Sequence, residues 1–154
     1  MTRLEELIIK LCPNGIKYNN LEDCCYILDS KRMPIAKSQR VEGKYPYYGA
    51  NGIQDYISDY LFEGEFVLVG EDGSVINSDG TPVVTWATGK IWVNNHAHVL
   101  KAKDEIISTD FLLYSLMFYD VTKLITGTTR KKLTRAGMEK ITLSIPTLSI
   151  QNKI

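Results

Sequence analysis

The stretch "PVVTWATGKIWVNNHAHVLKA", residues 82–102, decides the fold of this chain. It is rich in β-branched and aromatic residues, which pack well on the pleated surface of a sheet. Gly89 divides it into "PVVTWAT" (82–88) and "KIWVNNHAHVLKA" (90–102), and a glycine in this position is typical of a tight turn. The sequence therefore predicts two strands joined by a turn at Gly89.

Further strand and turn signals lie on both sides of this segment. The run "FVLV" (66–69) predicts a buried strand, and "ITLSI" (141–145) predicts another strand that Pro146 closes. Asp72-Gly73 and Asp79-Gly80 predict turns, because glycine adopts positive φ without strain. We therefore expect a mainly antiparallel, strongly twisted sheet.

Helices are expected near both ends of the chain. Residues 2–11 carry apolar side chains at helical spacing, with Thr2 and Glu5 at the spacing of a capping box. Pro13-Asn14-Gly15 should end this helix and turn the chain. The closing residues "PTLSIQNKI" (146–154) predict the start of another helix, with Ser149 as its N-cap.

The stretch "STDFLLYSLMFYDVTKLI" (108–125) breaks the β pattern. It begins with good helix-start residues, and its apolar side chains from Phe111 to Phe118 lie nearly all round the helix. Such a helix is buried or packs against another chain, and burial in the core is the favoured alternative. Together these signals predict an α+β fold that forms one domain, residues 1–154, with a few helices.

The composition is that of an ordinary globular chain of 154 residues, with 44% hydrophobic residues and a formal net charge of zero. No apolar run approaches the ~18 residues that a membrane span needs, and the N-terminus lacks a signal-peptide core. The three cysteines form no CxxC pair, and their odd number is typical of reduced thiols. We therefore expect a cytoplasmic protein that does not contact a membrane.

The charges are sorted along the sequence. One basic stretch runs from Lys31 to Lys44, and a second lies in "GTTRKKLTRAGMEK" (127–140). The segment 55–79 between them holds seven carboxylates and no Lys or Arg. Sorted charge of this kind predicts either one basic and one acidic face, suited to steering a polyanion, or solvated loops that merely segregate.

Hydroxyls and clustered cations are typical phosphate contacts, whereas Tyr, Asn and His can reach bases or sugars. Arg can also bind a guanine edge with two hydrogen bonds. Alternatively, the tyrosines pack in a turn, and Thr129 and Arg130 cap a short helix at Leu133–Glu139. The candidate DNA-binding residues are Lys31, Arg32, Lys37, Tyr47, Tyr48, Asn51, Asn94, Asn95, His96, Thr128, Thr129, Arg130, Lys131 and Lys132.

His96 and His98 would share one face of a strand, as two metal ligands do. However, the chain has no third histidine, and Ala102 and Lys103 stand where H-x-H metal sites place a carboxylate. A packed, hydrogen-bonded histidine and a surface polar cluster are the favoured roles, and we expect no metal. The chain also lacks a P-loop and a nucleophile elbow, which favours a binding module over an enzyme.

Two alternatives stay open at this point. One is a small metal-dependent nuclease that uses His96 and His98 with Glu71 or Asp72. The other is a protein-interaction module that binds a partner through the apolar helix 111–118.

The chain resembles one target-recognition domain of the DNA-specificity (S, HsdS) subunit of type I restriction-modification systems. The resemblance covers nearly the whole chain and rests on the order and spacing of four blocks. These blocks are "LEELIIKLCPNGIKY", "YPYYGANGIQDYISDYLFEGEFVLVGEDGSV", "PVVTWATGKIWVNNHAHVL" and "GTTRKKLTRAGMEKITLSIPTLSIQNKI".

This resemblance implies a non-catalytic chain that reads one half of a bipartite site on double-stranded DNA. Residues about 18–148 would read DNA, and residues 149–154 would begin the long spacer helix of the family. The implied partners are methyltransferase (M) subunits and a restriction (R) subunit, to which S-adenosylmethionine, ATP and Mg would belong. Since the family's S subunits have two such domains, this chain would be either a half-length S subunit that forms a homodimer or pairs with a second half-subunit, or a truncated form of a longer S subunit.

Overall fold

The computed structural model describes residues 2–13 and 17–154, which form an α+β fold, as predicted. Its main sheet has six strands, and all neighbours in it are antiparallel except the pair β3 and β6. A small second sheet pairs β1 (Tyr18–Asn20) with β8 (Thr142–Ser144). The main sheet has the order β2 (Cys25–Ile27), β7 (Ala97–Ala102), β5 (Phe62–Gly70), β6 (Val84–Val93), β3 (Glu42–Gly49) and β4 (Gly52–Ile57).

The helices are short, and none in the described residues is long and apolar enough to cross a membrane. Three single-turn 3₁₀ helices are η1 (Asp29–Lys31), η2 (Lys37–Gln39) and η3 (Thr122–Leu124). The α-helices are α1 (Arg3–Leu11), α2 (Leu21–Cys24), α3 (Thr109–Met117), α4 (Arg135–Met138) and α5 (Leu148–Gln151).

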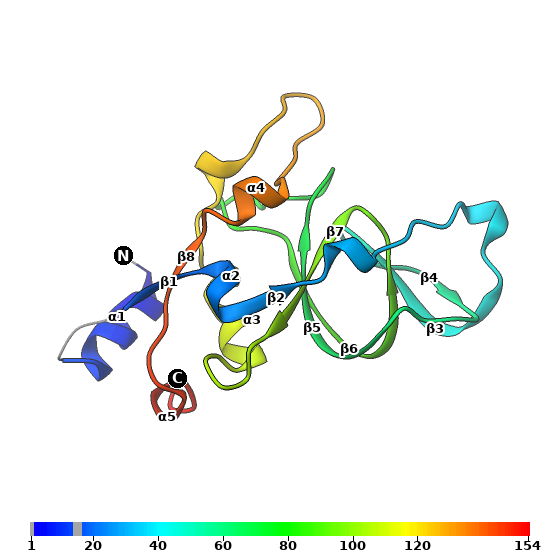
Figure 1. The fold of residues 1–154 in the computed structure, drawn as a ribbon. Coiled ribbons are helices and arrows are strands. Elements are labelled where there is room, and N and C mark those ends of the chain that lie inside the picture. Colours follow the sequence, from blue (N-terminus) through cyan, green and yellow to red (C-terminus); the bar gives the residue numbers. More distant parts are fainter. Residues whose placement is uncertain (1, 14–16) are drawn as a thin grey trace.

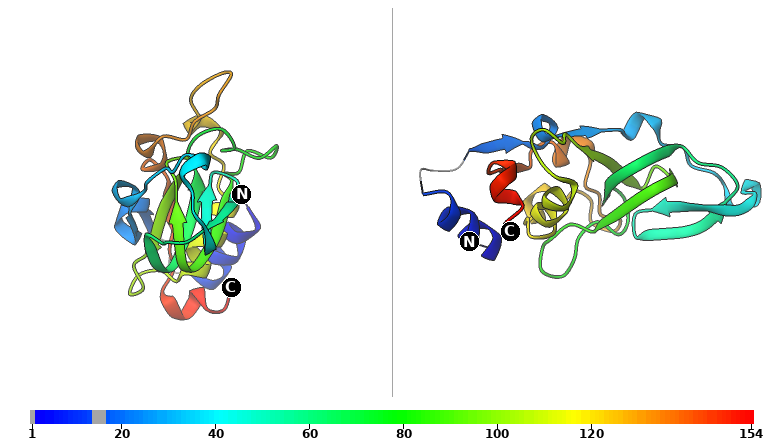
Figure 2. Two further views of the ribbon diagram at one scale, coloured as in Figure 1. Left: turned by 90° about the vertical axis from the view of Figure 1, so that its right-hand side faces the viewer. Right: turned by 90° about the horizontal axis from the view of Figure 1, so that it is seen from below.

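The molecule is elongated, with both termini and the helices α1 and α5 at one end and the β3–β4 hairpin at the other (Figures 1 and 2). The larger hydrophobic core joins α1, α2 and α3 to one face of the sheet, where Val67, Val69 and Leu100 are fully buried. A second core on the opposite face contains Phe66, Leu68 and neighbouring side chains. The sheet is therefore covered on both faces in its middle.

The predicted turn at Gly89 is wrong, because β6 continues through this residue without a turn. Gly89, with φ +88°, lies opposite Gly64, with φ +144°, and the β5–β6 ladder continues on both sides of this pair. Two facing glycines allow both strands to bend together in conformations that a Cβ would strain. The chain turns later, at Asn94–His96, so the predicted strand 90–102 is divided between β6 and β7.

Three predicted helices exist with altered bounds. Helix α1 has the predicted capping box, in which the Glu5 N–H donates to the Thr2 hydroxyl at 3.2 Å and the Thr2 N–H donates to Glu5 at 2.7 Å. Part of the turn predicted after it, Asn14-Gly15, lies outside the described residues. Helix α5 begins at Leu148 with Thr147 at its N-cap, so the prediction of Ser149 as N-cap is wrong.

Helix α3 is shorter than predicted and ends at Met117. Its N-cap is Ser108, whose hydroxyl accepts the Phe111 N–H at 3.1 Å. Phe111, Leu112 and Leu116 are buried, which confirms the predicted core role for one side of the helix. The opposite side is exposed, with Tyr114, Met117 and Phe118 each roughly half accessible to solvent.

Gln151 joins α5 to the start of α3 from a buried position. Its side-chain oxygen accepts the Ser108 N–H at 2.9 Å, and its amide nitrogen donates to the carbonyls of Ile106 and Pro146, both at 2.9 Å. A buried amide with three partners is expensive to remove, because each partner then lacks a hydrogen bond.

We therefore predict that Gln151→Ala lowers the free energy of unfolding by roughly 2 kcal/mol, since a buried group left unsatisfied costs about 1–3 kcal/mol. Urea denaturation should show a lower midpoint with an unchanged slope. The matched control is Asn152→Ala at the exposed neighbouring position, which should stay within about 0.5 kcal/mol of the wild type. Equal stability of the two variants would disprove the anchoring role of Gln151.

Candidate nucleic-acid interface

Residues 126–132 form a small hairpin, here called the basic hairpin, that stands out from the body of the molecule (Figure 1, gold). Thr126 and Lys132 close it through two backbone hydrogen bonds of 2.9 and 2.8 Å. Gly127 has φ +84°, and a Cβ there would lie 2.2 Å from the Arg130 carbonyl oxygen. Only glycine fits this position, so the tight fold of the hairpin follows directly from the sequence.

Backbone hydrogen bonds hold the basic hairpin against the turn that follows β5. The Gly73 N–H donates to the Lys131 carbonyl at 3.0 Å, and the Leu133 N–H donates to the Glu71 carbonyl at 2.8 Å. Leu133 is fully buried directly after the hairpin. The hairpin therefore has a defined position although its own side chains are exposed.

Two further turns meet at the same edge of the sheet. The Glu71 N–H donates to the His96 carbonyl at 2.8 Å, which places the turn 94–96 beside the segment 71–73. The Asn94 N–H donates to the Tyr48 carbonyl at 3.0 Å, which places the β3–β4 turn next to it. Arg32 reaches the same place, because its Nη1 donates to the carbonyls of Asn95 and Ala97 at 3.3 and 3.1 Å.

At this edge of the sheet, a polar surface cluster is formed by the side chains of Asp72, His96 and Arg130. The Arg130 Nε donates to Asp72 Oδ1, and His96 Nδ1 lies 3.8 Å from Asp72 Oδ2. The hydrogen bond from Arg130 is the main reason why the pKa of Asp72 is lowered. Asp72 is therefore a carboxylate at neutral pH, and Arg130 is its ion-pair partner.

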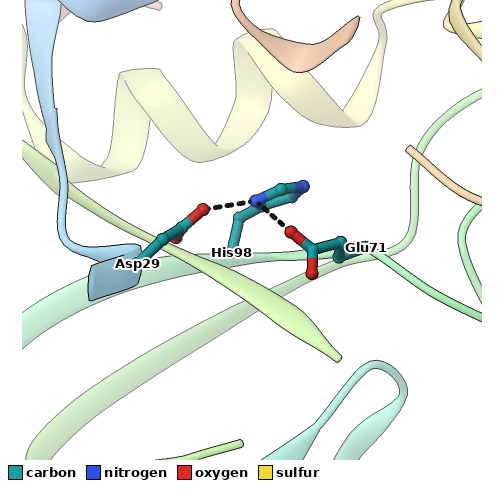
Figure 3. Close-up of side chains that lie close together, drawn as sticks. All are labelled: Asp29, Glu71 and His98. Carbon is teal, nitrogen blue, oxygen red and sulfur yellow. Dashed lines mark hydrogen bonds and ion pairs between the residues drawn. The ribbon is translucent and has the colours of Figure 1, made fainter. Parts of the chain in front are cut away.

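Beneath the surface lies a buried ion-pair network of Asp29, Arg32, Glu71 and His98 (Figure 3 shows its carboxylates and imidazole). His98 is completely buried, with Nδ1 at 2.7 Å from Asp29 Oδ2 and 3.3 Å from Glu71 Oε1. Its Nε2 lies 2.6 Å from the Leu133 carbonyl oxygen, which can only accept. Oxygen atoms therefore face both ring nitrogens of His98.

Asp29 is ionised despite its burial. Burial by itself would raise its pKa, but the hydrogen bond and charge of His98, the Val99 N–H and the nearby Arg32 together lower this pKa below its ordinary value. The Val99 N–H donates to Asp29 Oδ1 at 2.9 Å. Asp29 thus joins η1 to β7 through two strong hydrogen bonds.

The same network could in principle hold a metal ion, since Asp29, Glu71 and His98 offer ligand atoms within 4.8 Å of one another. However, Arg32 already lies 3.3 Å from Glu71 and 3.9 Å from Asp29. The Arg32 guanidinium is thus already the cation beside both carboxylates, and it would repel a divalent ion placed between them. The geometry therefore favours an ion-pair network, and the prediction of a packed, hydrogen-bonded histidine is confirmed for His98.

His96 and His98 do not share a site, in contrast to the expectation for a strand. His96 lies in the turn before β7 and faces Asp72, whereas His98 lies inside β7 and faces Asp29. The alternation of side chains applies only within a regular strand, and the strand begins at Ala97. The paired-histidine arrangement of the nuclease alternative is therefore absent from this structure.

Charges that are sorted along the sequence partly pair with one another in the structure. Carboxylates of the acidic segment pair with cations of both basic stretches: Asp55 with Arg40 at 3.4 Å, Glu71 with Arg32 at 3.3 Å, and Asp72 with Arg130. Three of the seven carboxylates in the acidic segment are thus neutralised by cations of the basic stretches. Long-range folding brings opposite charges together where the linear order kept them apart.

Three of the candidate DNA-binding side chains lie inside the molecule. Tyr47 is 1% exposed; its hydroxyl accepts the Ile35 N–H at 3.0 Å, and the Arg40 guanidinium lies 4.2 Å from its ring centre. Tyr48 belongs to the second hydrophobic core, and Asn94 is buried with its Oδ1 accepting the His96 N–H at 2.8 Å. We correct the expectation for these three residues, because their side chains support the site from within.

The other candidates are accessible in different degrees. Arg32 and His96 are partly buried, and Lys37 lies in η2 toward the β3–β4 end, away from the basic hairpin (Figure 1). The N-cap of α4 is Thr134, whose hydroxyl accepts the Gly137 N–H at 3.1 Å. The alternative in which Thr129 and Arg130 cap this helix is therefore wrong. The exposed candidates are Lys31, Lys37, Asn51, Asn95, Thr128, Thr129, Arg130, Lys131 and Lys132.

The sequence analysis missed Asp29 altogether, and it considered Glu71 and Asp72 as part of the acidic segment, as a turn signal and as carboxylates of a nuclease, but not as partners of His98 and Arg130. Asp29 and His98 are 69 residues apart in the sequence, and no local pattern connects them. The one available signal is a histidine within the buried strand pattern "HAHVL", since a charged or polar group there requires partners.

The ion pair between Asp29 and His98 predicts a stability difference that depends on pH. Because the pKa of Asp29 is lowered in the folded state, its stabilising effect is complete above the ordinary value of 3.8 and is lost as the pH falls below it. Asp29→Asn should lower the free energy of unfolding at pH 7 by roughly 3 kcal/mol, as expected for an uncompensated buried charge.

Urea denaturation between pH 3 and pH 7 would check this, with Asp104→Asn in an exposed turn as the control. The wild type and the control should lose stability steeply below pH 4, and Asp29→Asn should lose less. Parallel pH profiles of Asp29→Asn and wild type would show that Asp29 carries no net stabilising charge.

Comparison with known proteins assigns the chain to a family. The family model "Type I restriction modification DNA specificity domain" matches residues 13–154. A protein from Haemophilus influenzae named as a type I restriction enzyme specificity subunit is 40% identical over 153 residues, which are 99% of this chain and 38% of that protein. A type I specificity subunit from Mycoplasma pneumoniae is 31% identical over 157 residues, covering 97% of this chain and 63% of its own length.

Solved structures show the same fold. The S subunit of a type I restriction-modification system from M. genitalium superposes with a TM-score of 0.74 at 16% identity, over 90% of this chain and 37% of that chain. The HsdS subunit of Thermoanaerobacter tengcongensis superposes with a TM-score of 0.64 at 15% identity, over 97% of this chain and 40% of that chain. The chain thus spans about two fifths of the Haemophilus relative and of these subunits, and it belongs to the family of type I restriction-modification DNA specificity domains.

Proposed function

We propose that this chain reads one half of a bipartite site on double-stranded DNA as the specificity component of a type I restriction-modification complex. The observation that carries this proposal is the basic hairpin, which presents exposed cations and is hydrogen-bonded to residues 71–73, the segment that also holds the turn 94–96. Membership of the specificity-domain family supports it.

Phosphate contacts are assigned to the cations that remain free. Lys131 and Lys132 are exposed and form no ion pair with any residue that the structure describes. Thr128 and Thr129 offer exposed hydroxyls on the same hairpin, and Lys31 is exposed on η1. Free cations and hydroxyls on a projecting loop are the usual means of holding the DNA backbone.

Base or sugar contacts are assigned to exposed polar side chains on the two adjoining turns. Asn51 lies at the tip of the β3–β4 hairpin, and Asn95 and His96 lie between β6 and β7. Asn can bind adenine with two hydrogen bonds in the major groove. Because each turn connects strands of one sheet, these side chains have a rigid support, which sequence reading requires.

The remaining features of the proposal follow from the family. Residues about 18–148 would be the DNA-reading part, and residues 149–154 would begin a spacer helix. The chain itself would be non-catalytic, with methylation and cleavage carried out by M and R subunits and their S-adenosylmethionine, ATP and Mg. A second recognition domain, in the same or another chain, would read the other half of the bipartite site.

We predict that Lys131→Ala and Lys132→Ala each weaken DNA binding on all sequences and reduce the slope of log K against log salt by about one. The physical reason is the loss of one released counterion per removed phosphate contact. The matched control is Lys10→Ala on α1, at the opposite end from the β3–β4 hairpin.

The measurement is fluorescence anisotropy with duplex DNA across a salt series, for the chain alone and together with its methyltransferase subunit. A selection from a random duplex pool under the same conditions gives the half-site. If both hairpin variants keep the wild-type salt slope, the basic hairpin is not a phosphate-binding element.

A further inference from the structure

We propose that Arg130 recognises a guanine edge in the DNA major groove and that Asp72 is the residue that positions it for this contact. This inference rests on the proposed function, because it assumes that the basic hairpin faces duplex DNA. It separates Arg130 from the two neighbouring lysines, although all three lie consecutively in the sequence.

The first argument is the fixed geometry of the pair. Asp72 forms an isolated β-bridge with Lys132, and the hydrogen bonds from Gly73 to Lys131 and from Leu133 to Glu71 flank this bridge. Arg130 and Asp72 are therefore held on two backbones that are joined to each other. An arginine restrained in this way loses less side-chain freedom on binding than a free one.

The second argument is the set of donors that Arg130 keeps. Its Nε is used by Asp72 Oδ1, whereas Nη1 and Nη2 have no hydrogen bond to any residue in the described part of the chain. The side chain is 61% exposed, although that of Asp72 is only 21% exposed. The guanidinium thus keeps two unused donor nitrogens, and such a pair of donors matches O6 and N7 of guanine.

The third argument is electrostatic. A phosphate bound at this pair of donors would bring a second anion close to the Asp72 carboxylate, and like charges repel. The acceptors of a guanine edge carry no net charge, so that contact avoids the repulsion. Lys131 forms no ion pair among the described residues, so it binds phosphate without this penalty, whereas Lys132 lies opposite Asp72 and its charge helps to lower the pKa of that carboxyl.

His96 supports the same assignment from the other side of the carboxylate. Its Nδ1 lies 3.8 Å from Asp72 Oδ2, the oxygen that Arg130 Nε does not use. Asp72 therefore has Arg130 at one oxygen and the His96 ring near the other, although His96 Nδ1 forms no hydrogen bond to it.

The test uses the chain assembled with its methyltransferase subunit and a selection from a random duplex pool. We compare the wild type with Arg130→Ala, Arg130→Lys, Asp72→Asn and Lys131→Ala, and we confirm the fold of each by circular dichroism. Arg130→Lys is the decisive variant, because it keeps the positive charge and removes this pair of donors.

The wild type should enrich a motif with guanine at one position, and Arg130→Ala and Arg130→Lys should lose discrimination there by about 5- to 150-fold, as expected for one bidentate contact. Asp72→Asn should also relax that position while non-cognate affinity rises. Replacing this guanine by 7-deazaguanine, which lacks N7, should weaken the wild type and leave Arg130→Ala unchanged. Lys131→Ala should keep the motif and reduce only the salt slope.

Retention of the guanine preference by Arg130→Ala, with a salt slope reduced by about one, would identify Arg130 as a phosphate contact. The inference would then be wrong, and the proposed function would stand. If the assembled wild type enriches no motif at all, the proposed function fails and this inference fails with it.

Discussion

The buried polar network around His98 is the constraint on which the rest of this structure depends. A fully buried imidazole is tolerated here because Asp29 and Glu71 face one ring nitrogen and the Leu133 carbonyl faces the other. These contacts connect η1, the turn after β5, strand β7 and the end of the basic hairpin, which are far apart in the sequence. An apolar core of similar volume could be equally stable, but it would not fix these four segments in one register.

The position of the basic hairpin follows from this network. Leu133 is held at both of its backbone groups, since its N–H donates to Glu71 and its carbonyl accepts from His98. The hairpin can therefore expose all of its cations and still keep one position relative to the turns 49–52 and 94–96. Reading bases requires side chains held to within a fraction of an ångström, whereas holding phosphates requires only nearby charge. A buried ionic support beneath an exposed loop satisfies both needs.

The structural features that the sequence predicted correctly are those that depend on a local pattern. The capping box of α1, the buried run in β5 and the turns at Gly73 and Gly80 follow from spacing or from glycine alone. The prediction failed at Gly89, because the difference between a turn and a bent strand is decided by Gly64, 25 positions earlier and opposite it in the sheet. It also failed at Tyr47 and Asn94, whose residue types suit DNA contacts but whose neighbours bury them. The pairing of Asp29 with His98 had no local signal.

The order of charges along the sequence likewise does not predict which of them pair in the fold. The sequence keeps its acidic segment apart from its two basic stretches, yet folding pairs Arg32, Arg40 and Arg130 with carboxylates from that segment. The arginines are thereby oriented, and the lysines at 131 and 132 are left as free charges. This division suits the chemistry of the two side chains, because a planar guanidinium can bind a carboxylate and a second group at once, whereas an ammonium is a flexible point charge. A chain with no net charge can thus present a locally basic hairpin, and it is the spatial pairing of the charges that selects which cations remain available to DNA.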